Sequence, residues 1–430
     1  MKREKDAVKI SVILPSLNVG KYIVQCMESV LKQSLEELEI ICVDAGSTDG
    51  TLEVIEHYML IDPRVRLLIS DKKSYGYQLN LGINMAKGKY VGIVETDDFI
   101  AENMYELLFN AAEMGEVDFA KGNVIGITDD GKKTNIVLSD AKERTVTNLN
   151  RNRRIFPKDI LANCAGIYRT QFLLDNEICF NETPGASYQD TGFALQVYFS
   201  AERIVYLNDF VYFYRLDNAD SSVHSKEKTY CICDEFSFVK EKFKSKSWDE
   251  YRNLFSMFFY RKYKRNLERV DENLKKCFLN KFREDYIELK KDGWLDYIEW
   301  NEAEKNDLER IMVYGSEYIE YITEQRKIFL STLDPKKRII IYGAGIYADR
   351  VFSSIEDKSR VVSFLVSTKT TMPEKRGIPC ITIDEAYEYK STCQILIAVK
   401  DLNVQNEMRA NAEKAGFSKI FIIPYGLFDF

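Results

Sequence analysis

The chain has 430 residues, 45% of them hydrophobic and 30% charged, which is too apolar for an intrinsically disordered protein and long enough for about two or three domains. A formal net charge of −7 argues against a nucleic-acid partner, because such binding depends on Lys and Arg neutralising phosphates. The nine Cys lie scattered through apolar runs, and no apolar stretch approaches the ~18 residues of a membrane helix, so we expect a cytoplasmic protein with free thiols.

Strand-like and helix-like runs alternate at the start of the chain. The charged segment 1–9 leads directly into the first strand-like run, so we expect no secretory signal. Short β-rich runs predict strands at 9–14, 39–44, 65–69, 90–94 and 118–121. Apolar residues at helical spacing predict helices at 23–31, 51–60, 75–86 and 104–114. Because parallel strands require crossovers, the alternation predicts an α/β fold with a parallel sheet covered by helices on both faces.

The rest of the chain changes character three times. Segment 128–153 is polar and predicts an insertion or a hairpin over the sheet edge, after which shorter apolar runs follow. Segment 225–336 is rich in Lys, Glu, Phe and Tyr with almost no Gly or Pro, which favours amphipathic helices. The last part resumes the β-α alternation. We therefore predict three domains: a mixed-sheet domain at 1–225, a helical region at 226–335, and a small Rossmann-like α/β domain at 336–430.

Polar residues follow three of the predicted strands, at the edge where open α/β sheets bind ligands. The first strand ends in Pro15, Ser16 and Leu17, the second in Asp44, and the fourth in the run 95–98, Glu-Thr-Asp-Asp. If these strands are neighbours, their carboxylates repel one another unless a cation lies between them. Mg²⁺ or Mn²⁺ suits such a site, because it binds one or two carboxylates together with substrate phosphate oxygens. The alternative is that the Asp residues build turns and cap the following helices.

Four separated segments resemble family 2 glycosyltransferases of the GT-A fold. They are ISVILPSLN, IICVDAGSTDGTLEVI, SYGYQLNLGINMAKGKYVGIVETDD, and SYQDTGFALQVYFSAERIVYL followed by YFYRLDNADSS. The resemblance covers about residues 8–225. It implies an inverting transfer from a nucleoside-diphosphate sugar, usually a UDP-sugar, to an acceptor hydroxyl.

The resemblance also implies roles for individual residues. Pro15, Ser16, Leu17 and Asp44 would line the nucleotide pocket, Asp97 would lie near the donor ribose and the metal, Asp98 would bind the metal, and Asp190 would be the catalytic base. An inverting displacement needs one carboxylate opposite the leaving diphosphate, to accept the acceptor's proton. Without the resemblance, Asp190 would be read as a helix N-cap. His224 is a candidate to complete the metal shell, against the alternative of a polar loop residue.

Three positions depart from the family pattern. Ala45 stands where a second acidic residue often contacts the nucleobase, so uridine is expected from the family alone. Glu95 replaces a frequent Asp at the start of the metal motif. Gln189 replaces an acidic residue before the base, and a neutral neighbour should leave the pKa of Asp190 lower than a paired carboxylate would.

Two further motifs bear on the partners. The run FFYRKYKRNLERV, with Arg261, Lys262, Lys264, Arg265 and Arg269, suits a lipid headgroup layer or a lipid-diphosphate acceptor, although a helix that packs its aromatic residues inward fits it better. The G-x-G-x-x-A pattern at 343–348 can place a helix N-terminus at a diphosphate, but the next predicted strand ends at Ser367 and not at an acidic residue.

The leading prediction is a glycosyltransferase that uses a nucleotide-sugar donor, Mn²⁺ or Mg²⁺, and a glycan or lipid-linked acceptor in surface polysaccharide or glycolipid synthesis. Peripheral contact with the inner face of a membrane is a further expectation, and the oligomeric state stays open. One alternative is a nucleotide-sugar-binding scaffold with a degenerate transferase site, suggested by Ala45 and Gln189. The other is a nicotinamide-binding enzyme centred on the C-terminal domain.

Overall fold

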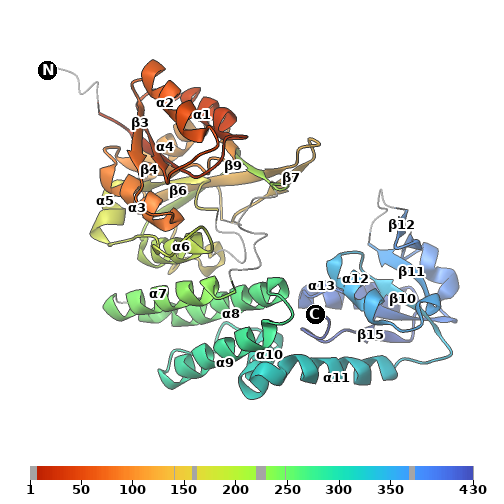
Figure 1. The fold of residues 1–430 in the computed structure, drawn as a ribbon. Helices are drawn as coiled ribbons and strands as arrows, with labels where there is room; N and C mark the ends of the chain where they lie inside the picture. Colours follow the sequence, from red (N-terminus) through yellow and green to blue (C-terminus); the bar gives the residue numbers. More distant parts are fainter. Residues whose placement is uncertain are drawn as a thin grey trace. The chain divides into compact units, whose positions relative to one another are not determined.

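The computed structural model describes residues 7–139, 141–156, 162–218, 229–246, 248–367 and 373–429 (Figure 1). The chain divides into two compact units, Met1–Tyr263 and Lys264–Phe430. This division falls within helix α8 (Arg252–Arg269), in the region that the sequence predicts to be helical. The predicted domain boundaries at 225 and 335 mark changes of secondary-structure type and stay a prediction.

The first unit is built on a nine-stranded sheet in the order β3-β2-β1-β4-β8-β6-β9-β5, with β7 paired to β6. Its strands are β1 Ile10–Ser16, β2 Leu38–Asp44, β3 Val65–Ile69, β4 Tyr90–Ile93, β5 Phe99–Ile100, β6 Phe119–Ile127, β7 Lys133–Ile136, β8 Gly166–Arg169 and β9 Ile204–Arg215. Its helices are α1 Ile23–Leu31, α2 Thr51–Ile61, α3 Tyr75–Met85, α4 Met104–Gly115, α5 Thr170–Asp175, α6 Gln189–Ser200 and α7 Cys231–Ser245, followed by α8. The strand and helix positions predicted up to residue 114 are confirmed.

Helices cover both faces of this sheet, as predicted. Successive side chains of a strand point to opposite faces. Along β1, Val12 and Leu14 belong to the apolar core formed with α1, α2 and α4. The intervening Ile13 faces α3, where a Cβ added to Gly82 would lie 2.5 Å from its side chain. Gly82 therefore allows α3 to pack closely against β1.

The predicted strands β3, β2, β1 and β4 are parallel, and beyond them the sheet is mixed, as predicted for the domain at 1–225. Strand β8 lies between β4 and β6 and is antiparallel to both. The predicted strand 118–121 extends to Ile127 as β6, which pairs in parallel with the long strand β9. Segment 128–153 begins with the predicted hairpin, because β7 folds back antiparallel onto β6. The sheet is thus mixed. Strands from distant parts of the chain extend the block of four parallel strands.

The second unit contains helices followed by a six-stranded sheet in the order β12-β13-β11-β10-β14-β15. Its elements after α8 are α9 Lys275–Lys291, α10 Glu302–Tyr314, α11 Tyr318–Ser331, β10 Arg338–Tyr342, α12 Ile346–Ser354, β11 Val361–Val366, β12 Glu374–Lys375, β13 Ile378–Thr382, β14 Cys393–Ile397, α13 Leu402–Lys414 and β15 Ile420–Ile422. Strands β13, β11, β10, β14 and β15 are parallel, and β12 is antiparallel. The predicted second α/β unit is confirmed, and its Rossmann-like relationship stays a prediction.

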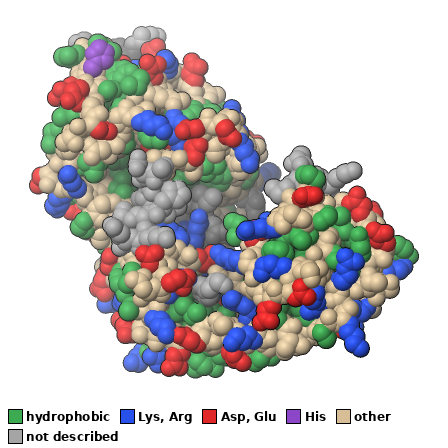
Figure 2. All heavy atoms as spheres, turned by 45° about the vertical axis from the view of Figure 1, so that its right-hand side comes forward, with side chains coloured by type: hydrophobic (Ala, Val, Ile, Leu, Met, Phe, Trp, Pro, Cys, Tyr) green, Lys and Arg blue, Asp and Glu red, His purple; other side chains and the backbone are tan. Residues whose placement is uncertain are grey.

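The aromatic residues of the basic run pack inward. Phe258, Phe259, Tyr260 and Tyr263 are at most 1% exposed, and Lys264 is also buried. The preferred interpretation, a helix with its aromatic residues in the core, is therefore confirmed. On the face drawn in Figure 2, Lys and Arg side chains are interspersed with Asp and Glu. None of the described helices combines the length and the apolar composition that a membrane crossing requires.

Candidate functional site

Side chains from α3 and the β4–β5 connection fix the carboxyl ends of β1 and β2. The amide of Gln78 donates to the carbonyl of Ser16 at 2.9 Å and to that of Val43 at 2.6 Å. The hydroxyl of Thr96 donates to the carbonyl of Pro15 at 2.7 Å. Both side chains are buried, so their hydrogen bonds tie α3 and the β4–β5 connection to the ends of β1 and β2. The ends of β1, β2 and β4 therefore form one edge, as predicted.

The carboxylate of Asp44 closes the turn that follows β2. It is fully buried, and its Oδ1 accepts from the backbone N–H groups of Gly46 and Ser47 at 2.9 and 2.8 Å. Its Oδ2 accepts from the Ser47 hydroxyl at 2.5 Å. Ala45 is buried beside it and donates its N–H to the Ser16 carbonyl. The turn-building alternative thus accounts for the hydrogen bonds of Asp44, and the role of 15–17 and Asp44 in nucleotide binding stays a prediction.

Glu95 lies at the start of the acidic run and receives a hydrogen bond from the Tyr75 hydroxyl. Its backbone N–H donates to Tyr212 Oη at 3.1 Å. Burial raises the pKa of Glu95 to about 8, and the negative charges of Asp97 and Asp190 add to the effect. The buried Glu95 is therefore held by hydrogen bonds to residues of α3 and β9.

Asp97 and Asp98 differ in their surroundings. Asp98 is 1% exposed, and its two oxygens accept from the Tyr212 hydroxyl at 2.9 Å and from the Arg215 N–H at 2.8 Å. Burial raises the pKa of Asp98 well above its usual value, with the charge of Asp97 as the next cause. Asp97 is half-buried; its Oδ2 accepts from Asn218 at 2.8 Å, and its Oδ1 has no hydrogen-bond partner among the described residues. Asp97 is thus the more available of the two carboxylates.

Asp190 reaches the same edge from α6. The loop before α6 docks on the start of α3, where Tyr75 N donates to the Gly185 carbonyl and Gly185 N donates to the Lys73 carbonyl. Asp190 lies in the first turn of α6 and accepts from the Thr191 N–H at 2.8 Å. Its charge raises the pKa values of both Glu95 and Tyr75. The fold therefore brings Asp190 close to the carboxylates after β4, although 92 residues separate Asp98 from Asp190.

The amide group of Gln189 supplies the hydrogen-bond donor that the surrounding oxygen atoms require. It is 1% exposed, and its Nε2 donates to the Thr183 hydroxyl at 3.0 Å and to the carbonyls of Thr183 and Gly185. Its Oε1 accepts from the Ser187 N–H. A carboxylate at this position could not donate to these carbonyls. The departure from the family pattern at Gln189 therefore stabilises the loop that carries Asp190.

We expect Gln189→Glu to destabilise the first unit by about 1–3 kcal/mol, because buried acceptors lose their donor and a charge is buried beside Asp190. The shift of the urea unfolding midpoint would measure this loss. Gln171→Glu is the matched control, since Gln171 is exposed and bonds only to Asp175 among the described residues. An unchanged midpoint for Gln189→Glu would contradict this account of the loop.

The sequence does not single out two titratable residues near Asp190. Lys121 on β6 is 1% exposed, and burial lowers its pKa to about 8 although the charge of Asp190 opposes the shift. A Lys within an otherwise apolar strand, FAKGNVIGI, was the signal available for it. Glu235 on α7 is fully buried and is electrostatically coupled to Asp190. Nothing in the local sequence around Glu235 distinguishes it from the exposed acidic residues of the helical region.

The side chains that could bind a metal suit a hard divalent cation only in part. Among the described residues, no group of three His, Cys, Asp or Glu side chains forms a ready-made metal cluster. However, Asp97 offers a carboxylate oxygen, and the pKa values of Glu95 and Asp98 are raised first by burial and then by the charge of Asp97, a shift that a bound cation would oppose. Mg²⁺ and Mn²⁺ take most of their ligands from water and substrate phosphates, so one or two carboxylates suffice. His224 lies outside the described residues.

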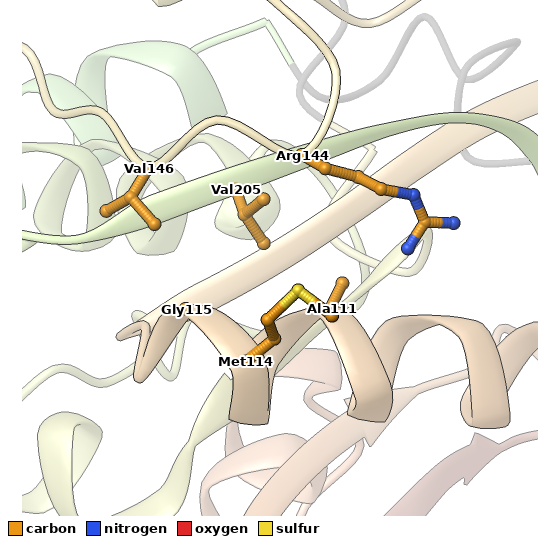
Figure 3. A pocket seen from close by; sticks show the side chains of 6 residues that line it. All are labelled: Ala111, Met114, Gly115, Arg144, Val146 and Val205. Carbon is orange, nitrogen blue, oxygen red and sulfur yellow. The ribbon is translucent and has the colours of Figure 1, made fainter.

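A cavity in the first unit, shown in Figure 3, lies away from these carboxylates. It is lined by Ala111, Met114, Gly115, Arg144, Val146 and Val205. Gly115 ends α4 shortly before β6, and Val205 is the second residue of β9, so the cavity lies at the amino ends of these strands and not at the carboxyl edge. Its volume of about 80 Å³ is well below the ~300–1,000 Å³ of typical ligand pockets. This cavity is not a candidate donor site.

The glycine loop of the second unit follows β10. Gly343 has a φ of +123°, and Lys375 Nζ donates to the Ala344 carbonyl at 2.6 Å. The same ammonium group lies 2.7 Å from Asp349 in the first turn of α12. The start of α12 thus already has a charged pair beside it, and dinucleotide binding by this loop stays an untested alternative.

The first unit is similar in sequence to known glycosyltransferases. The family profile "Glycosyl transferase family 2" matches residues 11–175. Glycosyltransferase GlyG of Streptococcus pneumoniae is 35% identical over 214 residues, which are 48% of this chain and 70% of GlyG. Poly(ribitol-phosphate) beta-N-acetylglucosaminyltransferase TarS of Staphylococcus aureus is 32% identical over 215 residues, which are 48% of this chain and 35% of TarS.

The fold comparison extends further along the chain. The crystal structure of S. aureus TarS 1–349 in complex with UDP-GlcNAc matches with a TM-score of 0.61 at 20% sequence identity. The match covers 74% of this chain and 92% of that one, which is more of this chain than the 263 residues of the first unit contain. The shared architecture therefore includes part of the chain beyond the mixed sheet.

Proposed function

The chain belongs to glycosyl transferase family 2, and we propose that this glycosyltransferase moves a sugar from a UDP-sugar to a hydroxyl group of a surface polysaccharide or glycolipid, with inversion. The observation that carries the proposal is the convergence of Asp97, after β4, and Asp190, on α6, at one sheet edge. The UDP-GlcNAc complex of the structurally similar TarS supports a uridine nucleotide as the donor.

In the proposed reaction, the acceptor oxygen attacks the anomeric carbon while the bond from that carbon to the UDP oxygen breaks. Asp190 accepts the proton of the attacking hydroxyl, so one carboxylate suffices for a single displacement with inversion. No neighbouring acidic residue at 189 competes for this proton, because Gln189 is neutral and turned into its own loop. The half-buried position of Asp190 leaves it accessible to an acceptor.

The residues after β4 would hold a divalent cation. Asp97 would hold it through its unbonded Oδ1, and Asp98 and His224 remain the predicted further ligands. When bound, Mn²⁺ or Mg²⁺ supplies a Lewis acid for the charge that develops on the leaving diphosphate. The hydrogen bonds from Tyr212 and Arg215 would keep Asp98, and with it the turn of Asp97, in place.

UDP release across a panel of UDP-sugars and glycan or lipid-linked acceptors tests the proposal. We expect turnover with Mn²⁺ that is lost in EDTA and restored by added Mn²⁺. Asp97→Asn should weaken metal-dependent donor binding, whereas Asp175→Asn, at the exposed end of α5, should not. Donor binding without turnover for every acceptor would support the scaffold alternative. Turnover that persists unchanged in EDTA would contradict the role of Asp97.

A further inference from the structure

Glu235, on helix α7, is a buried carboxyl group without hydrogen bonds. Its exposure is 0%, and neither of its side-chain oxygens has a hydrogen-bond partner among the described residues. Burying such a group without partners is costly, and most buried polar groups are therefore hydrogen-bonded. The proposed reaction does not use Glu235, so its position needs a separate explanation.

The carboxyl group of Glu235 lies directly against the helix that carries Asp190. A Cβ added to Gly192 would be 2.2 Å from Glu235 Oε2, so any larger residue at this position would require the Glu235 carboxyl group to move. Gly192 is two residues after Asp190, in α6, and the rest of this helix is buried from Thr191 to Phe199. Gly192 therefore leaves the space through which Glu235 reaches the backbone of the first turn of α6.

The first turn of α6 depends on contacts with other parts of the unit. Its N-cap, Tyr188, has a φ of +65° and makes no side-chain capping bond. The buried Asn163 donates to the Asp190 carbonyl at 2.7 Å, and Gln189 anchors the preceding loop. Glu235 approaches the same turn from the side of α7. The orientation of Asp190 is thus set by residues outside its own helix.

We propose that Glu235 is a positioning residue for Asp190, which would make helix α7 part of the catalytic unit. This inference rests on the proposed function of Asp190. It also assigns a role to the helical region, which begins after the segment that resembles the family. The carboxyl group of Glu235 packs on the Gly192 backbone and keeps the first turn of α6 in the orientation that presents Asp190 to the acceptor.

The charge of Glu235 matters for this role. Burial raises its pKa to about 8, and the charges of Asp190 on α6 and Asp234 on α7 add to the shift. Asn181 and the Gly192 backbone lie near and favour the ionised form, but neither makes a hydrogen bond of good geometry. Below pH 8, a protonated Glu235 can pack beside Asp190 without like-charge repulsion. Above pH 8, its ionisation should disturb the turn.

Four variants test the inference through the kinetics of UDP release: Glu235→Ala, Glu235→Gln, Gly192→Ala, and Gly192→Ala combined with Glu235→Ala. We expect Glu235→Ala to lower kcat at least tenfold while the KM for the donor stays within twofold. Glu235→Gln keeps a neutral group of the same shape, so it should retain kcat at pH 7 and lose the alkaline fall of the wild type near pH 8. Glu241→Ala, an exposed position on the same helix, is the control.

The Gly192 variants test the contact itself. The added methyl group of Gly192→Ala should displace Glu235 and lower kcat. The double variant should lose no more than Glu235→Ala does, because both changes act on one contact. A Glu235→Gln profile that equals the wild type at every pH would overturn the proposal, as would a loss confined to KM. Absence of transfer by the wild type itself would instead contradict the proposed function. Full activity of Asp190→Asn would contradict the role of Asp190 as the general base.

Discussion

Asp190→Asn is expected to lower kcat by about a thousandfold while metal-dependent binding of the UDP-sugar stays unchanged. A positioned general base contributes roughly 10²–10⁴-fold to a rate, and an amide cannot accept the acceptor's proton. The substitution preserves the local structure, because an Asn oxygen can still accept from the Thr191 N–H, as Asp190 Oδ1 does. The effect should therefore fall on the chemical step.

Steady-state UDP release and calorimetric titration with the donor separate the two parts of this prediction. Asp175→Asn is the control, because Asp175 is an exposed carboxylate at the end of α5. A variant that loses donor binding and kcat together would show that Asp190 serves the donor side of the site. A kcat within tenfold of the wild type would remove Asp190 as the base.

Lys264→Met is expected to destabilise the second unit by about 3–5 kcal/mol, the usual cost of removing one partner from a buried ion pair. The Lys264 ammonium group lies 2.9 Å from Asp307 Oδ2 and 3.2 Å from Asp429 Oδ2, and all three side chains are nearly inaccessible. Tyr318 accepts a hydrogen bond from Lys264 at 3.2 Å and donates one to Asp307. Methionine would fill the space and leave the carboxylates without this charge.

The same network ties Asp429 to α12 and to the connection after β14. Lys400 lies 2.6 Å from Asp429 Oδ1, and Arg350 donates to the Asp429 carbonyl at 2.7 Å. Burial alone would raise the pKa of Asp429, but the ammonium groups of Lys264 and Lys400 outweigh it and lower the pKa. Gly426 has a φ of +77° and no side chain, which leaves room for Asp307 beside it. Loss of Lys264 therefore disturbs several elements together.

Urea unfolding followed by circular dichroism measures this effect. Lys276→Met is the matched control: it removes an exposed pair with Glu320, and surface pairs contribute little. Because the pKa of Asp429 is lowered in the folded state, its contribution is present above its unfolded pKa of about 4 and is lost as pH falls through the folded value. The difference between the wild type and Lys264→Met should therefore shrink below about pH 4. A difference that is small at pH 7 would contradict the structural importance of the network.

The sequence by itself determined the strand–helix couplets of both sheets and the helical region. Each depends on the spacing of apolar residues within a short window, which reports local periodicity directly. The placement of Asp44, Asp97 and Asp98 at the carboxyl edge followed from the same couplets. The motif segments were sufficient to identify the family.

Only the tertiary structure decided which of these residues form hydrogen bonds or pack against others, and with which partners. Strand β8 enters the sheet from a distant segment, and Asp98 is bonded by Tyr212 and Arg215, more than 110 residues away. Glu235 likewise packs against Gly192, and the local sequences of the two helices do not predict this contact. Local periodicity shows which face of an element is buried, but it does not show which distant side chain meets that face. The difference between Asp97 and Asp98 therefore became visible only in the folded chain.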